Sequence, residues 1–292
     1  MKRRFLALMM VFFAAVFLVS GFLLARTLMQ NRRQEKIFQE MIGLFPDTVD
    51  MLQTPSTEER AAGSRDGEDA ERTDTKEADA VVPLKERIPP EEWKARWEEA
   101  AKERFPIYQR LTEGNPDIVG WVRIVDTAID YPVCQTPQDP EYYLHRDVNG
   151  ADSSYGTPFL DAACSLEDPR SSLLIYGHHM KNGRMFAALQ NYTDVSFYQQ
   201  HPYIQFDTLT EAGSYEVVAA LKLEADGTQV LWQDLLFPAD GENFASAWES
   251  ICSNVFYNIG VGVSMEDELL ALVTCEYTLQ NGRLMVIARR IF

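Results

Sequence analysis

The chain has 292 residues, of which 46% are hydrophobic, and a formal net charge of -17 at pH 7. No basic stripe follows the N-terminal region, so we expect no nucleic-acid partner. The four cysteines (Cys134, Cys164, Cys252 and Cys275) lack CxxC or other metal-ligand spacing, which argues against a zinc site and a disulfide framework. A single Cys134–Cys164 bridge stays open.

The N-terminus predicts a membrane anchor. Residues 1–4 include three basic side chains, and residues 5–25 form an uncharged apolar run about long enough to cross the ~30 Å hydrocarbon core as a helix. A cleaved signal peptide is the alternative, but its apolar core usually has about 7–15 residues, and no small-x-small cleavage site follows the run. Basic residues lie on both sides of the span, so the positive-inside rule leaves the orientation open.

Residues 26–88 are expected to connect this anchor to a folded domain. Their first part, to about Phe45, has apolar residues spaced as in a helix that continues out of the bilayer. From Asp47 to about Val82 the sequence is acidic and rich in Thr, Ser and Gly, and it cannot bury enough apolar surface to fold. We expect a flexible stalk here, with an acidic partner-binding tail as the alternative.

The folded domain is predicted over residues 89–292, and it opens with helices. Prolines and acids at 89–92 suit a first helical turn, and apolar residues follow at helical spacing: Trp93, Trp97 and Ala101. Pro106 is expected to interrupt this helix, with a second short helix running to Thr112.

Beyond residue 114 the hydrophobic period becomes that of strands. Eight strands are predicted, at 118–125, 128–133, 156–160, 172–176, 203–206, 215–223, 269–274 and 284–291. An apolar face at helical spacing from Phe244 to Val255 predicts one helix inserted late in the domain. Short strands that follow the N-terminal helices in the chain favour a mainly β fold, a closed or nearly closed barrel, over a doubly wound sheet.

Cys275 is the candidate nucleophile. It ends a near-continuous apolar run that begins at Leu269, which is typical of a strand covered on both faces. A small, inert buried thiol is the alternative interpretation. A papain-like hydrolase is disfavoured because those enzymes place the histidine after the cysteine, and no histidine follows Cys275.

A thiol nucleophile needs a base, and the chain offers four histidines: His145, His178, His179 and His201. A second apolar strand ends on Gly177 followed by His178 and His179, the same placement at a strand end as Cys275. His145 and His201 lie in polar, aromatic or Pro-flanked stretches that indicate surface or turn positions. The residues alone do not separate His178 from His179.

Attack on a carbonyl also needs donors for the oxyanion, and Arg283 and Arg289 both compete for this role. A tight hairpin at residues 281–282 would pair Cys275 near Ala288 and leave Arg283 about 16 Å away along the ladder. A looser loop over residues 277–282 would bring Arg283 beside Cys275. The backbone N–H of Glu276 could supply a second donor.

Several segments together are similar to the class B sortases, membrane-anchored cysteine transpeptidases of Gram-positive surfaces. They are Asn115-Pro-Asp-Ile-Val-Gly-Trp-Val, Ile129-Asp-Tyr-Pro-Val, Tyr142-Tyr-Leu-His-Arg-Asp, Gly156-Thr-Pro-Phe-Leu-Asp, Ile175-Tyr-Gly-His-His-Met and Val273-Thr-Cys with Arg283. The resemblance covers about residues 93–292. It departs at Val273, where class B members often have Ser, and at Asp139-Pro140, where many have Asp-Asn.

This resemblance implies roles for individual residues. His178, which directly follows the glycine, Cys275 and Arg283 match the catalytic histidine, cysteine and arginine of sortases. Leu144, Tyr176, Thr274 and Glu276 would line the peptide groove. The implied fold is a sortase-like barrel with N-terminal helices and a late inserted helix, without metal or organic cofactor.

The implied function is cleavage of a C-terminal sorting signal after Thr, through a thioacyl intermediate, and transfer of the protein to an amine acceptor. Expected partners are surface proteins with a sorting motif, a peptidoglycan precursor or other amine, and the lipid membrane through residues 5–25. The catalytic domain would lie outside the cell, attached to a single-pass membrane anchor, with residues 1–4 in the cytoplasm. A membrane-tethered cysteine endopeptidase and a non-catalytic peptide-binding module are the alternatives.

Overall fold

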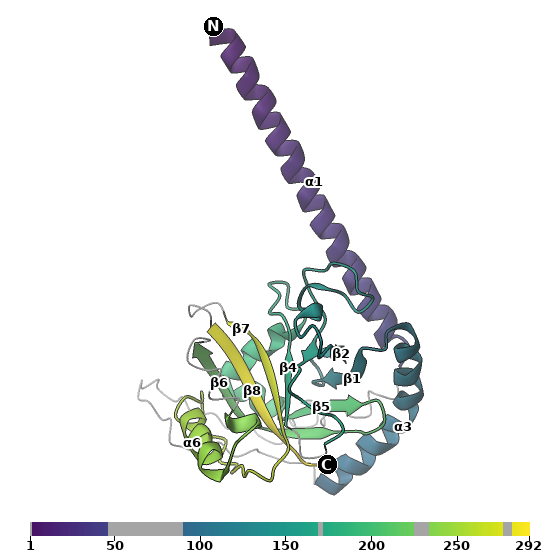
Figure 1. Ribbon diagram of the computed structural model, residues 1–292, viewed down its shortest axis with the longest axis vertical. Coiled ribbons are helices and arrows are strands. Elements are labelled where there is room, and N and C mark those ends of the chain that lie inside the picture. The colour runs from purple at the N-terminus through teal and green to yellow at the C-terminus, as the bar shows by residue number, and fades with distance from the viewer. Residues whose placement is uncertain (1, 46–89, 169–171, 225–233, 277–281) are drawn as a thin grey trace, which may run out of the picture.

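A β-barrel with a long helix projecting from it makes up the molecule (Figure 1). The computed structural model describes residues 2–45, 90–168, 172–224, 234–276 and 282–292. Helix α1 (Lys2–Ile42) begins the chain and runs from the projecting end down to the barrel. An 18-residue window within Phe12–Ile42 has a mean hydropathy of 2.0, so α1 is long and apolar enough to cross a membrane.

Eight strands close the barrel in the order β1-β2-β3-β4-β7-β8-β6-β5. They are β1 (Ile118–Arg123), β2 (Asp130–Cys134), β3 (Phe159–Leu160), β4 (Leu173–Tyr176), β5 (Tyr203–Thr208), β6 (Ser214–Glu224), β7 (Leu269–Glu276) and β8 (Gly282–Arg290). The prediction of a closed, mainly β barrel is confirmed. The apolar run of β7 is buried from Leu269 to Val273, as expected for a strand covered on both faces.

Two strand pairs are parallel, and one of them decides where the site forms. Strand β4 pairs with β7 in parallel register, Tyr176 opposite Val273, whereas β7 pairs with β8 antiparallel. The N–H of Gly177 continues the β4–β7 ladder by donating to the carbonyl of Val273 at 3.0 Å. Because parallel strands end at the same edge, the residues after Tyr176 and after Val273 lie side by side.

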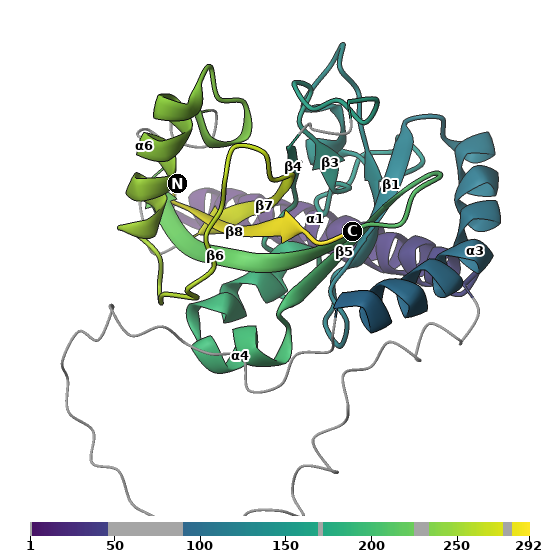
Figure 2. The same ribbon diagram turned by 90° about the horizontal axis from the view of Figure 1, so that it is seen from below.

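Helices flank the barrel on opposite sides, with α3 (Pro90–Gly114) beside β1 and β5 and α6 (Gly241–Cys252) beside β6 (Figure 2). Helix α6 is the predicted late helix, and the Asp240 carboxylate caps it by accepting from the N–H groups of Glu242 and Asn243. Short helices also lie between the strands, among them η2 (Tyr142–His145), η3 (Phe186–Thr193) and α4 (Val195–Gln200).

The prediction that Pro106 breaks the leading helix is wrong, because α3 runs through it without interruption. A proline inside a helix costs about 3 kcal/mol, but burial on both sides of it, at Ala101 and at Tyr108, outweighs that cost. The same face carries an ion pair that the sequence did not indicate. Arg104 and Asp207 of β5 lie 2.8 Å apart, with side chains only 4% and 2% exposed.

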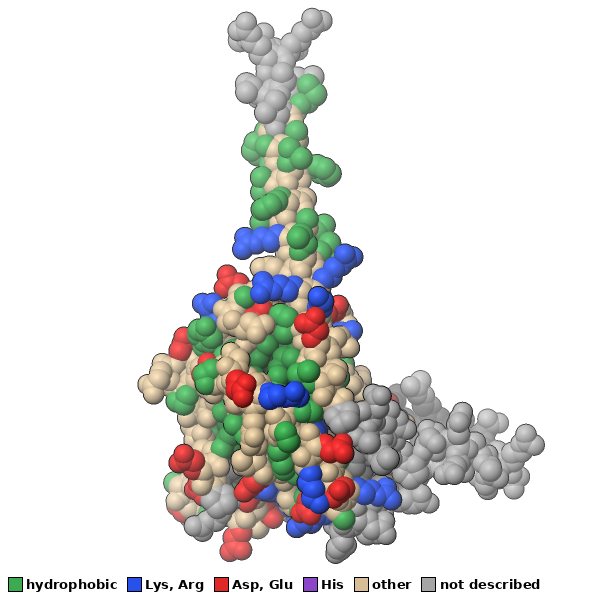
Figure 3. Space-filling view, turned by 90° about the vertical axis from the view of Figure 1, so that its right-hand side faces the viewer, with side chains coloured by type: hydrophobic (Ala, Val, Ile, Leu, Met, Phe, Trp, Pro, Cys, Tyr) green, Lys and Arg blue, Asp and Glu red, His purple; other side chains and the backbone are tan. Residues whose placement is uncertain are grey.

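Helix α1 does not stop at the edge of the globular part. Its last turns pack on the barrel, where Gln34, Phe38 and Met41 are buried. The ring of Phe45, just past the helix, packs against Trp121 at 4.8 Å between centroids. Lys and Arg side chains gather where α1 enters the globular part, below its apolar stretch (Figure 3).

The globular unit therefore includes residues 34–45 as well as the chain from residue 90, beyond the predicted boundary at residue 89. In chain order, the acidic residues 46–88 follow α1 and precede α3. The predicted flexible stalk, from Asp47 to about Val82, falls outside the described residues. The segment before it, to about Phe45, was predicted as a helix, and α1 runs to Ile42.

Candidate active site

The shared edge of β4 and β7 opens into a groove of about 360 Å³ that contains the three residues predicted to act in catalysis, His178, Cys275 and Arg283. The other lining residues are Pro140, Glu141, Leu144, Phe159, Asp161, Ala162, Tyr176, Gly177, Val273 and Thr274. Each strand contributes its last residues, so the groove follows directly from the parallel β4–β7 pair.

The register of β7 and β8 places Arg283 directly opposite Cys275. Directly opposed residues in an antiparallel pair project from the same face of the sheet, so both side chains belong to one site. This register is the one expected with Arg283 beside Cys275, and Ala288 pairs with Leu270 instead. The predicted loop itself, residues 277–281, lies outside the described residues. Arg289 lies at the far end of β8, 3.5 Å from Glu216, and does not line the groove.

His178 is held through one ring nitrogen. Its Nε2 lies 2.7 Å from the carbonyl oxygen of Leu144. A carbonyl oxygen can only accept a hydrogen bond, so Nε2 carries the proton of the neutral ring and Nδ1 is the acceptor. The Nδ1 atom is therefore the position that can take up and release a proton.

A second histidine lies against this ring. His145, on η2, stacks on His178 with centroids 5.8 Å apart and an angle of 24° between the planes. Burial lowers the pKa of His178, the hydrogen bond to Leu144 opposes that change, and the nearby His145 lowers the pKa further. Sequence reasoning set His145 aside as a surface or turn residue; its place next to His178 depends on the η2 turn, which was not predicted.

His179 has a different environment from His178. Its Nδ1 lies 3.1 Å from the carbonyl oxygen of Cys275, and it does not line the groove. His201 lies away from the site, and its Nδ1 donates to the carbonyl of Val125 at 3.0 Å. The sequence alone could not distinguish His178 from His179. The directions of two consecutive side chains depend on the backbone of the turn after β4, which the sequence pattern does not give.

The other thiols differ from Cys275 in burial and in place. All four cysteines are unbridged, so the possible Cys134–Cys164 disulfide is absent. Burial raises the pKa of Cys134 far above its ordinary value and that of Cys164 to about 12, which makes both inert at neutral pH. Cys275 is half-buried at the groove, and Cys252 is exposed at the end of α6.

The predicted peptide-binding residues lie around the groove with one gap. Leu144, Tyr176 and Thr274 line it. The Thr274 side chain is 2% exposed, and its hydroxyl has no hydrogen-bond partner among the residues described. Glu276 pairs with Gly282 through its backbone, whereas its side chain lies outside the described part.

Asp161 is a groove residue that was not singled out from the sequence. Asp161 accepts a hydrogen bond from the hydroxyl of Tyr176 at 3.0 Å, while the Tyr176 ring stacks on Phe159 at 5.3 Å between centroids. The segment Gly156-Thr-Pro-Phe-Leu-Asp161, one of those shared with class B sortases, carried the signal for its position.

Comparison with known proteins agrees with this geometry. The family model described as sortase domain matches residues 122–291. Sortase B of Listeria monocytogenes is 32% identical over 178 residues, which cover 60% of this chain and 70% of the relative. This chain belongs to the sortase B family. As a sortase, it is a cysteine transpeptidase.

Further relatives extend the match over the described domain. Sortase B of Staphylococcus aureus is 29% identical over 191 residues, covering 64% of this chain and 75% of the relative. The crystal structure of a mutant form of Clostridium perfringens sortase B has a TM-score of 0.61 and 26% identity, covering 67% of this chain and 91% of that one.

Proposed function

We propose that this sortase cleaves the C-terminal sorting signal of surface proteins after a threonine and joins the new carboxyl end to an amine of the cell wall. Cys275 is the nucleophile, His178 the general acid and base, and Arg283 the oxyanion donor. The observation that carries the proposal is the groove in which β4, β7 and β8 bring His178, Cys275 and Arg283 together.

In the first half-reaction the Cys275 thiol gives its proton to Nδ1 of His178, and the resulting thiolate attacks the carbonyl carbon of the threonine. The tetrahedral intermediate then breaks its C–N bond, and the leaving amine takes a proton from Nδ1 of His178. In the second half-reaction the acceptor amine attacks the thioester, gives its proton to the same Nδ1 atom, and releases the thiolate. The hydrogen bond from Nε2 to Leu144 persists throughout, because that nitrogen stays protonated in both forms of the ring.

Arg283 is the residue proposed to stabilise two negative charges that arise in turn, on the Cys275 sulfur and on the carbonyl oxygen of the substrate. Arg283 pairs with Cys275 on the neighbouring strand and lines the same groove, so its positive charge would favour the thiolate before attack and the oxyanion after it. Its Nη1 donates to the carbonyl of Gly282 at 3.1 Å, and the fork carries further N–H groups that the substrate could use. The N–H of Glu276 is the proposed second donor.

Leu144, Tyr176, Thr274 and Glu276 are the proposed peptide-binding residues. The hydroxyl of Thr274 supports this role, because it is buried without a partner among the described residues, which is costly, and a bound peptide amide would satisfy it. The uncharged surface of Leu144 beside the charged groups would accept an apolar side chain of the sorting motif.

The proposed location is the outer face of a cell membrane. Residues 5–25 of α1 would cross the bilayer with residues 1–4 inside, and the barrel would lie outside, where sorting substrates and wall precursors meet. The length and apolar composition of α1 support an anchor. The basic residues below the apolar stretch would lie at the headgroup level.

A transfer assay with the full-length chain in detergent micelles tests these roles. A peptide with a sorting motif should be converted to its amide with the added amine, and Cys275→Ala should abolish the reaction. His178→Ala should lose activity while His179→Ala retains most of it; equal effects would refute the assignment of His178. Release of the free acid at the same rate with and without amine would instead favour an endopeptidase, and binding without turnover would favour a peptide-binding module.

A further inference from the structure

The chain that carries His178 folds back on itself over residues 177–186. The N–H of Phe186 donates to the carbonyl of His178 at 2.9 Å, and His179 pairs with Met185. Met185 has a φ of 57°, in the left-handed region, and its side chain is fully buried. A non-glycine residue keeps such a backbone only where surrounding contacts hold it.

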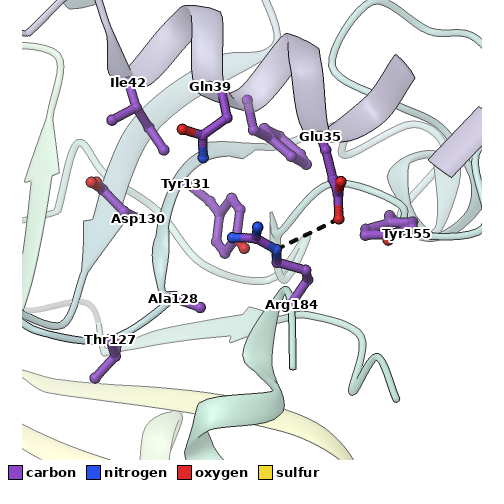
Figure 4. A pocket seen from close by; sticks show the side chains of 10 residues that line it. Glu35, Gln39, Ile42, Thr127, Ala128, Asp130, Tyr131, Tyr155 and Arg184 are labelled. Carbon is purple, nitrogen blue, oxygen red and sulfur yellow. Dashed lines mark ion pairs between the residues drawn. The ribbon is translucent and has the colours of Figure 1, made fainter. Parts of the chain in front are cut away.

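Several of these contacts come from the docked end of α1. Glu35 lies 3.6 Å from the guanidinium of Arg184, which reaches up from the His178 segment toward the helix (Figure 4). Phe38 packs edge-on against Tyr131, with centroids 4.9 Å apart. The Tyr131 hydroxyl in turn accepts the N–H of Met185 at 3.0 Å. Helix α1 therefore supports this segment both directly and through Tyr131.

Helix α1 also supports the other side of the imidazole. The buried amide of Gln34 donates to the carbonyl of Gly156 at 3.4 Å. Gly156, with φ +60°, lies so close to Leu144 that a Cβ atom there would stand 2.6 Å from the Leu144 carbonyl oxygen. That oxygen is the one that accepts the hydrogen bond of His178. The segment that carries His178 and the segment that supplies the Leu144 carbonyl are thus both supported by α1.

We propose that the docked end of α1, through Gln34, Glu35 and Phe38, is a positioning element for His178, so that the membrane anchor is part of the active-site support. The proposal rests on the assigned role of His178 in proton transfer. A chain in which this contact is weakened keeps its thiol and its groove but transfers protons poorly, because His178 is no longer held in one place. A displacement of about 1 Å at a catalytic group can cost about a hundredfold in rate.

Two buried residues of α1 provide a matched pair of variants for the full-length chain. Phe38 and Met41 are 5% and 8% exposed, but Phe38 contacts Tyr131, whereas Met41 belongs to a separate cluster with Tyr108 and Trp121. Phe38→Ala should lower kcat about ten- to a hundredfold with little change in KM. Met41→Ala should leave kcat near the wild-type value.

The pH profile of kcat separates positioning from general destabilisation. Burial is the main cause of the low pKa of His178, so loosening its segment should move that pKa upward toward the ordinary value. Phe38→Ala should show this shift, and Met41→Ala should not. Equal kcat values and equal pH profiles for the two variants would overturn the proposal.

The ion pair between Glu35 and Arg184 gives a second test, in which the substitutions do not open a cavity. Glu35→Arg and Arg184→Glu should each lower kcat, and the double exchange should recover it, because the contact is restored with reversed charges. Single variants with wild-type kcat would count against the proposal. A wild-type chain that transfers no acyl group, or that keeps its activity in His178→Ala, would instead refute the proposed function.

Discussion

The ion pair between α3 and the barrel gives a stability prediction that the structure makes quantitative. The carboxylate of Asp207 accepts hydrogen bonds from Trp97 Nε1 at 2.9 Å, Arg104 Nε at 3.0 Å and the Tyr108 hydroxyl at 2.7 Å. The Arg104 guanidinium also lies over the Trp97 ring, 3.9 Å from its centroid. Asp207 is therefore the acceptor on which three side chains of α3 converge.

Asp207→Ala leaves the Arg104 charge buried without its partner. Removing one member of a buried ion pair costs about 3–5 kcal/mol, and a domain of this size loses about 2–4 °C of Tm per kcal/mol. We expect Tm to fall by about 6–20 °C, measured by tryptophan fluorescence of the full-length chain in detergent micelles. The double variant Arg104→Met with Asp207→Leu should recover part of the loss, because no buried charge then remains.

Glu98→Ala is the matched control. Glu98 lies on the same helix and pairs with Lys94 at 3.7 Å, but both side chains are about half exposed. Such a surface pair contributes about 0.3–0.5 kcal/mol, so Tm should change by no more than about 2 °C. If Asp207→Ala melted within about 2 °C of Glu98→Ala, the buried network would not hold α3 to the barrel, and the reasoning would be refuted.

Three further predictions concern the groove. Arg283→Ala should lower kcat by about 10²–10³-fold while Arg289→Ala changes it little, as single-turnover acylation rates would reveal; similar losses in both would contradict the register argument. His145→Ala removes a neighbour that lowers the pKa of His178, so the part of the pH–kcat profile that reports the titration of His178 should move to higher pH. An unchanged profile would contradict the electrostatic effect of His145 on His178. Thr274→Val removes a buried hydroxyl that lacks a partner among the described residues; Tm should hold or rise while KM increases, and an unchanged KM would exclude the hydroxyl from peptide binding.

Patterns along the chain predicted which residues end strands, but not how the strands pair. The apolar runs before His178 and Cys275 indicated two buried strands, and the structure confirms both as β4 and β7. The position of Arg283 depended on the register of β8 against β7, which the periodicity of the sequence does not determine. Both registers were compatible with the same hydrophobic pattern.

Long-range contacts account for what the sequence did not indicate. Arg104 and Asp207 are 103 positions apart, and Glu35 and Arg184 lie in segments that no local pattern relates. Pro106 looked like a break because propensity is local, whereas burial of the surrounding face is tertiary. The docking of α1 was missed for the same reason, since its apolar residues were equally consistent with a free juxtamembrane helix.

Mass spectrometry of the full-length chain, mixed with peptides of the LPxTG, NPxTN and SPxTG types without an amine acceptor, tests the role of Cys275 most directly. We predict a thioacyl adduct on Cys275 with one of these peptides, its mass equal to the segment that ends at the threonine. Cys275→Ala should form no adduct, and added amine should discharge the adduct of the wild-type chain. A chain that turns over the peptide with the adduct on another residue, or with full activity in Cys275→Ala, would contradict this mechanism.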